Sequence, residues 1–540
     1  MRCRFGPFVG VILFVLLLSA TLGAAALLGG VPAFAGAPPT SAPAAPSPAS
    51  ADDPLALLAV QQAQLLDSDG GYGDLFGHAV AISGDTAVVG AYQDDVGGNA
   101  NQGSACVFVR SGGSWTQQAE LTASDSAADE QFGNSVAISG DTGVVGAWCD
   151  TVGTTTQQGS AYVFTRSGTT WTQQAKLTAS DGAAYDQFGS SVAVSQDTAV
   201  VGSWSDDVGS NANQGSAYVF VRGGTAWTQQ AHLTASDGAE YDCFGFAAAI
   251  SGDTAVLGAP FADVGANVRQ GAAYIFARSG TTWNQQLKLT AGEAGDLFGY
   301  SVAISGDTAV VGAEFHHIGT HADQGSAYVS VRSGTTWSPP LMLAAADGAA
   351  DDYFGCSVAI SSDTLVVGAR ARDVGANANQ GCAYAFTRTS SGAWTQQAQL
   401  LVADGAAGDE LGYSVAVSGD SGVVGAEGHA VGANSSQGAA YVFTGLMAAP
   451  DTPTPGSPRG FIRRRVPTFR WSAVAGADSY KVCVYRGGRL VAIKTGITAT
   501  EWRCTTTLRR CTWLTWQVRA RNAGGASPWS AARRFWLRRL

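Results

Sequence analysis

The sequence predicts an all-β protein, and two observations support this prediction. A Phe-Gly dipeptide returns in steps of 56, 56, 56, 54, 56 and 57 residues, at Phe76, Phe132, Phe188, Phe244, Phe298, Phe354 and, in degenerate form, Leu411-Gly412. Each interval holds four short stretches of strand composition and almost no helical periodicity. A fixed period of this length is typical of repeat architectures, and seven units of four antiparallel strands indicate a seven-bladed β-propeller.

The four predicted strands follow in a constant order within each unit. The first (SVAIS) and second (TAVVGA) are joined by a pair such as Gly84-Asp85, which suits a two-residue hairpin because Gly adopts positive φ without steric cost. The third (AYVF) follows Gln-Gly. The fourth (WTQQAxL) alternates like a half-buried outer strand. This alternation is expected to place four residues on one face: Trp115, Gln117, Ala119 and Leu121.

The two ends of the repeat predict a closed ring. The seventh unit has three strands, up to Phe443, and lacks the Trp strand. The stretch Gln61–Leu65, ahead of the first Phe-Gly, matches QQAxL, with Ala59 at the position of the Trp. Pairing this N-terminal strand with the strand around Tyr441 would complete the last blade and remove two exposed strand edges. We therefore predict one closed domain over residues 55–445.

A family resemblance follows from the same residues. The run from Phe244-Gly245 to Gly258-Ala259-Pro260 resembles the FG-GAP repeats of bacterial surface proteins and of the integrin α-chain head, and the likeness covers all seven units. The resemblance implies a seven-bladed propeller used for extracellular binding or adhesion. A kelch-type propeller is the alternative. Some family members hold calcium between the first two strands of a blade, but here that connection is too short for an oxygen cage.

The N-terminal residues predict export. Residues 1–35 are predicted to be a signal peptide, because Arg2 and Arg4 precede an apolar run from Val9 to Leu28 and a small-residue cleavage box at 33–35. The apolar run is long enough to span a bilayer, so an uncleaved membrane anchor is the alternative. Residues 36–54 are rich in Pro, Ala and Ser and are expected to form a disordered spacer. A secreted or cell-surface location follows from either alternative.

The C-terminal part differs in composition. Residues 446–460 are a Pro-rich linker, and residues 461–540 resemble a fibronectin type III β-sandwich in the motifs around Tyr480-x-Val482 and Trp516-x-Val518. Trp516 stands where that family has Tyr, which removes a hydroxyl. Cys504 and Cys511 could form a disulfide, with Cys483 left over. The cysteines within the repeats are expected to be small buried residues: Cys106, Cys149, Cys243, Cys356 and Cys382.

Charge is divided between the two parts of the chain. Residues 459–540 hold 16 Arg and 2 Lys against Asp478 and Glu501, a net charge of +16, which leaves −27 for the rest of a chain whose total is −11. The Arg excess indicates either a solvated face, adhesion to an anionic cell-wall or glycan polymer, or docking onto the acidic propeller. No specific nucleic-acid motif accompanies it. We expect a monomer.

One face of the propeller has room for a ligand site. The loops after the second strands and the connections between blades should share one end of the blades, opposite the tight turns. The residue two positions after the Gly of VVGA differs from blade to blade, as an asymmetric ligand requires. An arc of aromatic rings there would stack on sugars or hold a protein, unless the rings pack between loops. The predicted ligand-binding residues, with Pro260 at the remaining blade, are Tyr92, Trp148, Trp204, Phe261, Glu314, Arg370 and Glu427.

Two sets of residues are candidate metal ligands. The first is the histidine group His316, His317 and His321 of blade five. The second is the aspartates of the connections, which alternatively cap turn amides and would otherwise hold a cation such as Ca²⁺. They lie seven residues before the Phe-Gly aromatic (Asp69, Asp125, Asp181, Asp237, Asp347 and Asp404) and two before it (Asp74, Asp186, Asp242, Asp296, Asp352 and Asp409). No other cofactor is expected.

No catalytic motif is present in the sequence: there is no nucleophile signature, phosphate-binding loop or zinc-hydrolase signature. The predicted function is a secreted or cell-surface, non-enzymatic binding or adhesion scaffold that recognises a glycan or protein on the long-loop face. The alternative is an extracellular polysaccharide-active enzyme, a hydrolase or lyase that uses loop carboxylates. A third interpretation is a structural envelope component held to the cell wall by the Arg-rich module.

Overall fold

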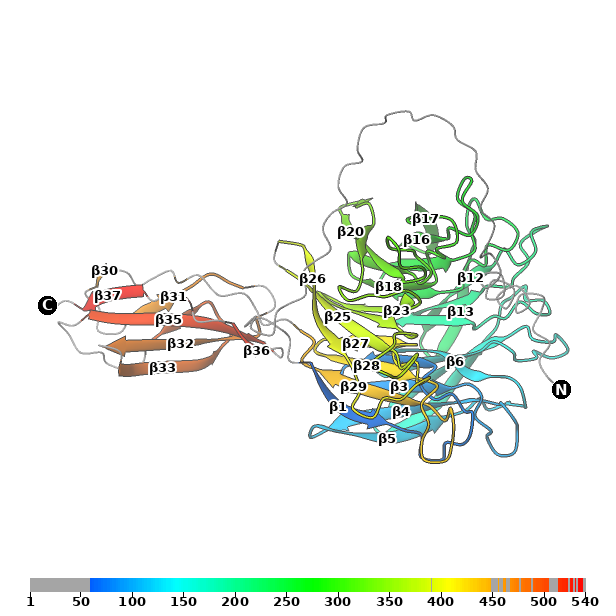
Figure 1. Cartoon of the computed structure of the whole chain (residues 1–540), viewed down its shortest axis with the longest axis horizontal. Coiled ribbons are helices and arrows are strands. Elements are labelled where there is room, and N and C mark those ends of the chain that lie inside the picture. Colours follow the sequence, from blue (N-terminus) through cyan, green and yellow to red (C-terminus); the bar gives the residue numbers. More distant parts are fainter. Residues whose placement is uncertain are drawn as a thin grey trace, which may run out of the picture. The chain divides into compact units, whose positions relative to one another are not determined.

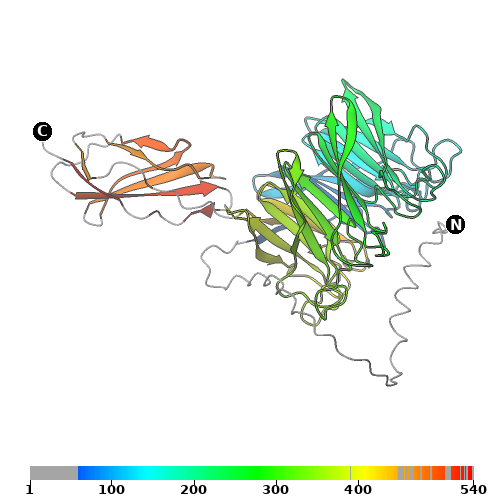
Figure 2. The same cartoon turned by 90° about the horizontal axis from the view of Figure 1, so that it is seen from above.

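The computed structural model describes residues 59–389 and 391–447, residue 455, and the segments 460–462, 467–474, 477–486, 489–504, 513–522, 525–527, 530 and 533–537. All regular structure in these residues is β-strand (Figures 1 and 2). Within them, no helix could cross a membrane. The predicted signal peptide and spacer lie outside the described residues, as does most of the predicted linker.

The seven repeats form seven antiparallel sheets of four strands, here numbered one to seven along the chain. The first strands are β2 (Ala79–Ser83), β6 (Phe132–Ser139), β10 (Ser191–Ser195), β14 (Ala248–Ser251), β18 (Ser301–Ser305), β23 (Phe354–Ser361) and β27 (Val415–Ser418). The second strands are β3 (Thr86–Ala91), β7 (Thr142–Ala147), β11 (Thr198–Ser203), β15 (Thr254–Ala259), β19 (Thr308–Ala313), β24 (Thr364–Ala369) and β28 (Ser421–Ala426).

The other two strands of each sheet follow in the same order. The third strands are β4 (Ser104–Ser111), β8 (Ser160–Ser167), β12 (Ser216–Gly223), β16 (Ala272–Ser279), β20 (Ser326–Ser333), β25 (Cys382–Arg388) and β29 (Ala439–Thr444). The fourth strands of sheets one to six are β5 (Ser114–Leu121), β9 (Thr170–Leu177), β13 (Ala226–Leu233), β17 (Thr282–Leu289), the pair β21 (Thr336–Trp337) and β22 (Leu341–Leu343), and β26 (Trp394–Leu400). Pro339-Pro340 separates β21 from β22, because proline cannot donate to the ladder.

The fourth strand of sheet seven comes from the other end of the chain. It is β1 (Val60–Leu65), which pairs antiparallel with β29 and places Gln64 opposite Tyr441, so the predicted pairing is confirmed (Figure 1). The first strand of each sheet contacts that of the next, and β27 contacts β2 in the same way. Leu446 and Met447, the first two residues of the predicted linker, also contact sheet seven: Leu446 is fully buried in its core, and Met447 N donates to Asp420 at 3.0 Å.

Each sheet is buried on both faces, and this explains the strand sequences. All six residues of every second strand are buried, as expected for a continuous apolar run such as TAVVGA. Ser83 and Thr86 face each other across the predicted two-residue turn, and Gly84 has φ of 59°. The first two strands therefore form the expected hairpin.

The prediction for the fourth strand is wrong in one respect. A β-bulge between Val107 and Phe108 places Gln117 opposite Phe108 and Ala119 opposite Val107, so the alternation changes phase at the Gln-Gln pair. Trp115 consequently packs into one core with Phe108, while Leu121 packs into the next core with Val107. The physical reason is that a sheet with neighbours on both sides needs apolar side chains from its outer strand on both faces.

Glycines allow neighbouring sheets to approach closely. A Cβ on Gly146 of sheet two would overlap the backbone oxygen of Gly189 in sheet three, and a Cβ on Gly425 would overlap that of Gly77. Gly189 and Gly77 are the glycines of Phe-Gly, with φ of 91° and 95°. The two glycine positions of the repeat are therefore fixed by backbone contact between sheets, including the contact of sheet seven with sheet one.

The C-terminal strands form a six-stranded and a two-stranded sheet. The first contains β30 (Gly460–Ile462), β37 (Arg533–Leu537), β35 (Trp513–Asn522), β32 (Ser479–Arg486), β33 (Arg489–Ile497) and β36 (Gly525–Ala526), and the second contains β31 (Thr468–Arg470) and β34 (Glu501–Arg503). The Phe469 ring lies 5.4 Å from Trp502 and 5.1 Å from Trp516, so both sheets contribute to one core.

Candidate functional site: the long-loop face of the repeat domain

The long loops and the connections between sheets lie at one end of the sheets, as predicted. Backbone hydrogen bonds join them: Tyr185 N donates to Thr156 O at 3.0 Å, and Tyr241 N donates to Ala212 O at 2.9 Å. These bonds link the loop after the second strand of one sheet to the connection that enters the next. We call this end the long-loop face.

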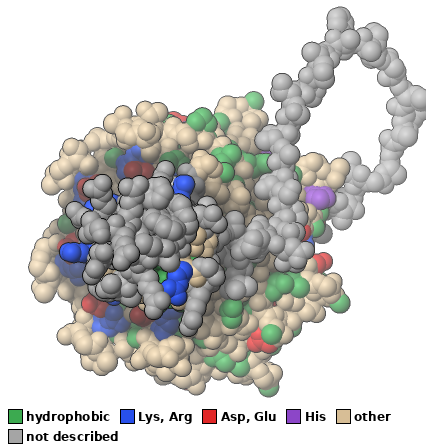
Figure 3. Space-filling view, turned by 90° about the vertical axis from the view of Figure 1, so that its left-hand side faces the viewer, with side chains coloured by type: hydrophobic (Ala, Val, Ile, Leu, Met, Phe, Trp, Pro, Cys, Tyr) green, Lys and Arg blue, Asp and Glu red, His purple; other side chains and the backbone are tan. Residues whose placement is uncertain are grey.

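The opposite end carries the tight turns and a repeated ion pair. Arg166 Nη2 lies 2.6 Å from Asp141, its Nη1 donates to Thr86 of the preceding sheet at 2.8 Å, and its guanidinium lies 5.3 Å from the Trp171 ring. A polar cavity of about 600 Å³ lies beside this group and the equivalent Arg222. In the face shown in Figure 3, basic and acidic side chains lie next to one another in several places. Every described cation in this motif is paired, which indicates a role in joining sheets.

The aromatic residues of the predicted ligand-binding set are half-buried, so the expected exposed arc is not formed. Tyr92 packs on His78 with ring centroids 4.3 Å apart. Trp204 and Phe261 both contact the Phe246 ring, at 6.3 and 6.2 Å. His78 and Phe246 each follow a Phe-Gly dipeptide directly. His78 lies in the same sheet as Tyr92, and Phe246 lies in the same sheet as Phe261 and in the sheet after that of Trp204. The rings thus pack on side chains of their own or the next sheet, so they are covered within the molecule and do not form an exposed arc.

The other members of that set also have partners within the molecule. Trp148 Nε1 donates to Gln131. Glu314 is 1% exposed and lies 3.4 Å from Arg370, while Glu427 lies 2.7 Å from His78 Nδ1. Burial raises the pKa of Glu314, and the Arg370 guanidinium counteracts part of that shift. The structure brings these charged side chains together as ion pairs between sheets.

Each sheet also has a polar site near its long-loop end, which we call the edge pocket. In sheet two it is formed by Asp125 and Glu130 of the incoming connection, Asp150 of the long loop, Tyr162 of β8 and Lys176 of β9. Lys176 Nζ lies 2.7 Å from both Asp125 Oδ2 and Asp150 Oδ2. The Tyr162 hydroxyl lies 3.0 and 3.1 Å from the same two aspartates. One ammonium group therefore compensates two carboxylates.

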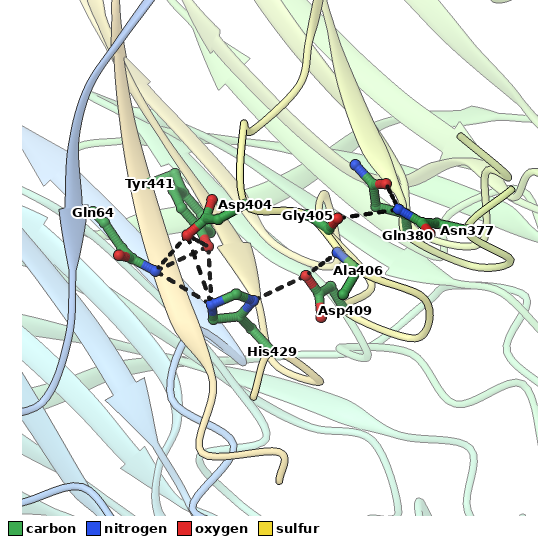
Figure 4. A network of polar contacts seen from close by, with 9 residues as sticks. All are labelled: Gln64, Asn377, Gln380, Asp404, Gly405, Ala406, Asp409, His429 and Tyr441. Atoms are coloured by element: carbon green, nitrogen blue, oxygen red, sulfur yellow. Dashed lines mark hydrogen bonds and ion pairs between the residues drawn. The ribbon is translucent and has the colours of Figure 1, made fainter. Parts of the chain in front are cut away.

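The edge pocket of sheet seven shows the same arrangement with other residues (Figure 4). His429 Nδ1 lies 2.9 Å from Asp409, and Gln64 of β1 donates to Asp404 at 3.1 Å and to the Tyr441 hydroxyl at 3.0 Å. The hydrogen bond to Asp409 raises the pKa of His429, against the effect of burial. A side chain from the N-terminal strand thus completes a pocket otherwise built by sheet seven.

The aspartates of the connections have two roles in these pockets. The aspartates that lie two positions before Phe-Gly accept hydrogen bonds from turn amides. Ala239 N donates to Asp242 at 2.8 Å, and Ala406 N donates to Asp409 at 2.8 Å. The aspartates that lie seven positions before Phe-Gly form ion pairs with the basic side chain of the pocket, as Asp237 does with Lys288 at 2.7 Å. The turn-capping interpretation therefore accounts for the first set, and pairing with an internal cation accounts for most of the second.

The histidines of sheet five are not brought together. His316 Nδ1 lies 2.6 Å from Asp296, whereas His317 Nδ1 accepts from Asp323 N at 3.1 Å and His321 Nδ1 lies 3.1 Å from Gln324. Within the described part of the chain, no group of three or more His, Cys, Asp or Glu side chains is arranged to hold a metal ion. Of the predicted disulfide, Cys504 is buried and Cys511 lies outside the described residues.

Three exposed tyrosines on the long-loop face were missed by the sequence analysis. Tyr72, Tyr185 and Tyr241 lie in the connections and are 78%, 58% and 45% exposed. Tyr185 and Tyr241 stand three residues before Phe-Gly in adjacent repeats, with φ of 72° and 66°. A signal for this conformation was present in the sequence, because the same repeat position is glycine in three other units: Gly73, Gly295 and Gly408.

Comparison with protein families agrees with this architecture of repeated four-stranded sheets. A model of the FG-GAP repeat matches residues 59–108, 115–164, 171–220, 227–276, 283–330, 337–386 and 394–443. The chain therefore belongs to the FG-GAP repeat family. Each match takes in a fourth strand and the three strands of the following sheet, and the first begins just before β1. No curated protein matches the chain.

Proposed function

We propose that the seven sheets form a closed β-propeller, similar to the head of integrin α-chains, and that this secreted or cell-surface protein is a non-enzymatic binding scaffold. The pairing of β1 with β29 and the circuit of contacts among first strands support closure. The C-terminal sheets, which share one core, would then be a fibronectin type III-like sandwich. Its Arg-rich sequence makes it a spacer or an anchor to an anionic cell-wall polymer.

We propose that the ligand is a glycan or a glycan-bearing protein bound at the long-loop face. The observation that carries this proposal is the pair Tyr185 and Tyr241, which repeat the same position in neighbouring sheets and are both exposed. Exposed aromatic rings stack on the apolar faces of sugars and are common anchors of protein interfaces.

The backbone conformation of these two tyrosines strengthens the argument. A bulky residue at positive φ costs about 1–2 kcal/mol relative to its ordinary conformation, and glycine avoids that cost. Glycine occupies the same position in sheets one, five and seven, and Asp129 occupies it in sheet two with φ of 65°. Tyrosine is therefore unfavourable for folding at this position, and strain of this kind is concentrated at functional sites.

The test is the double variant Tyr185→Gly with Tyr241→Gly, screened against wild type on glycan and matrix-protein arrays. We expect at least tenfold weaker binding of the array ligand, because two stacking surfaces are lost. The free energy of unfolding should stay equal or rise by about 1 kcal/mol per site, because glycine relieves the strained φ.

Asp129→Gly is the matched control, because it makes the same change of backbone in sheet two without removing a ring. It should leave binding at the wild-type level. Unchanged binding by the double tyrosine variant, or an equal loss in the control, would remove the tyrosines from the proposed site.

A further inference from the structure

The edge pocket of sheet one differs from the other six in its charge. Sheets two to seven each place one basic side chain in the pocket, within 3.6 Å of a carboxylate: Lys176, His232, Lys288, His316, Arg372 and His429. In sheet one, Glu120 occupies the fourth-strand position of Lys176. Asp94 occupies the long-loop position that is His316, Arg372 or His429 in sheets five to seven. The third-strand tyrosine is replaced by Cys106.

A further carboxylate enters the same pocket. Asp67 stands where sheet two has Ala123, and it is only 5% exposed. Its Oδ1 accepts hydrogen bonds from Cys106 Sγ and Gln117 Nε2, both at 3.3 Å. Its Oδ2 is buried and has no hydrogen-bond partner. A buried carboxylate oxygen without a donor costs free energy, so a hydrogen-bond donor that reached this oxygen would stabilise the folded protein.

Five carboxylates therefore share this pocket without a cation: Asp67, Asp69, Asp74, Asp94 and Glu120. No ion pair among the described residues includes any of them, whereas sheets two to seven all have such pairs. Burial, with neighbouring carboxylates, raises the pKa of Asp67 to about 7 and that of Asp94 to about 6. Burial is the main cause of both shifts, and the negative charges of neighbouring carboxylates add to it.

We propose that the edge pocket of sheet one binds a primary ammonium group supplied by another protein, namely the end of a lysine side chain. Sheet two is the internal template, because there the ammonium of Lys176 sits 2.7 Å from two aspartates in the equivalent frame.

The pocket is accessible from outside the sheet. Asp69 and Glu120 are exposed, while Asp67, Asp74 and Asp94 are buried behind them. An incoming lysine would reach the buried aspartates past Glu120, over the fourth strand, where the Lys176 side chain of sheet two also lies. The proposal does not depend on the tyrosines of the proposed glycan site, and the experiments below measure cation binding at the edge pocket of sheet one alone.

The first experiment measures binding of a short lysine peptide to the full chain by NMR titration and by thermal shift, at constant ionic strength. The same peptide with an acetylated lysine is the control, because it lacks only the ammonium. We expect the lysine peptide to bind at least tenfold more tightly than the acetylated one and to raise the melting temperature. Equal responses to the two peptides, or stabilisation by Ca²⁺ but not by the lysine peptide, would overturn the proposal.

The second experiment supplies the ammonium within the chain. Glu120→Lys recreates the fourth strand of sheet two, so it should raise the melting temperature and abolish the response to the lysine peptide. Thr116→Lys adds a lysine at an exposed position of the same strand and should do neither. The proposal fails if both variants shift the melting temperature equally, or if Glu120→Lys still responds to the peptide as wild type does.

Discussion

Single substitutions within the repeat set the charge of each edge pocket. Sheets two, six and seven build their pockets at equivalent positions, yet Lys176 supplies the cation from the fourth strand, whereas Arg372 and His429 supply it from the long loop. Burial raises the pKa of Glu130 in sheet two to about 7, as it raises that of Asp67 in sheet one. The repeat domain therefore carries buried acids that hold protons near neutral pH, and its stability should depend on pH.

Asp67→Asn tests that dependence. The pKa of Asp67 is raised to about 7 in the folded protein from an ordinary value near 3.8, so its favourable contribution is complete below about pH 4 and is lost as pH rises through 7. Wild type should lose stability over this window, and the asparagine variant should lose less. We expect the variant to gain up to about 4 kcal/mol over wild type between pH 4 and pH 8, measured by urea unfolding. Parallel pH profiles would contradict the assignment.

The strand sequences reflect the need to pack on two sides. The second strands are continuously apolar, and the fourth strands change phase at a bulge, because both faces of a sheet meet a neighbour. At the closest contacts between two sheets, the backbone of one lies against the backbone of the other. Glycine is required there because a Cβ would overlap the neighbouring backbone. Strand β7 contains two glycines: Gly146 lies at a contact with the next sheet, and Gly143 does not.

Gly146→Ala and Gly143→Ala compare these two positions within β7. A Cβ at Gly146 would overlap the backbone of Gly189, so we expect a loss of about 1–3 kcal/mol in the free energy of unfolding. A Cβ at Gly143 would lie 3.6 Å from Trp171 Cζ3, an ordinary contact, so alanine should gain about 0.4–1 kcal/mol there. Chemical denaturation of both variants provides the measurement, and equal effects would contradict the close-contact explanation.

For the whole repeat domain, the important contact is the one between its two ends. Leu65 of β1 is 2% exposed and packs with Phe76, Val442 and their neighbours in one core. Gln64 connects the same strand to the edge pocket of sheet seven (Figure 4). The N-terminal strand is thus held by apolar packing, by backbone pairing and by polar contacts.

Leu65→Ala should therefore lower the stability of the whole repeat domain rather than loosen a tail. We expect a loss of about 2–5 kcal/mol in a single cooperative unfolding transition, followed by far-UV circular dichroism. Val60→Ala removes a 57% exposed side chain from the same strand and should change the stability little. If Leu65→Ala behaved like this control, β1 would not be an integral part of the sheet.

Much of the fold could be predicted from the sequence, because it depends on local signals. The positions of the strands, the hairpin at Gly84 and the partner of β1 follow from the period, from turn residues and from the missing Trp strand. The residues of the candidate site could be predicted less well. The sequence indicated that the long loops and the connections between sheets share one face, but on that face it selected Tyr92 and Trp204, which are half-buried, and missed Tyr185 and Tyr241, which are exposed.

The sequence by itself determined the all-β repeat, its number of units and the pairing of its ends, because these depend on periodicity and on residues close along the chain. Only the tertiary structure decided which side chains face solvent and which charges lack a partner. His78 covers Tyr92, and Phe246 covers Trp204 from the next sheet, through contacts that no local pattern specifies. Exposure and electrostatic compensation depend on side chains that the fold brings together from different strands, loops and sheets, so only the tertiary structure shows them.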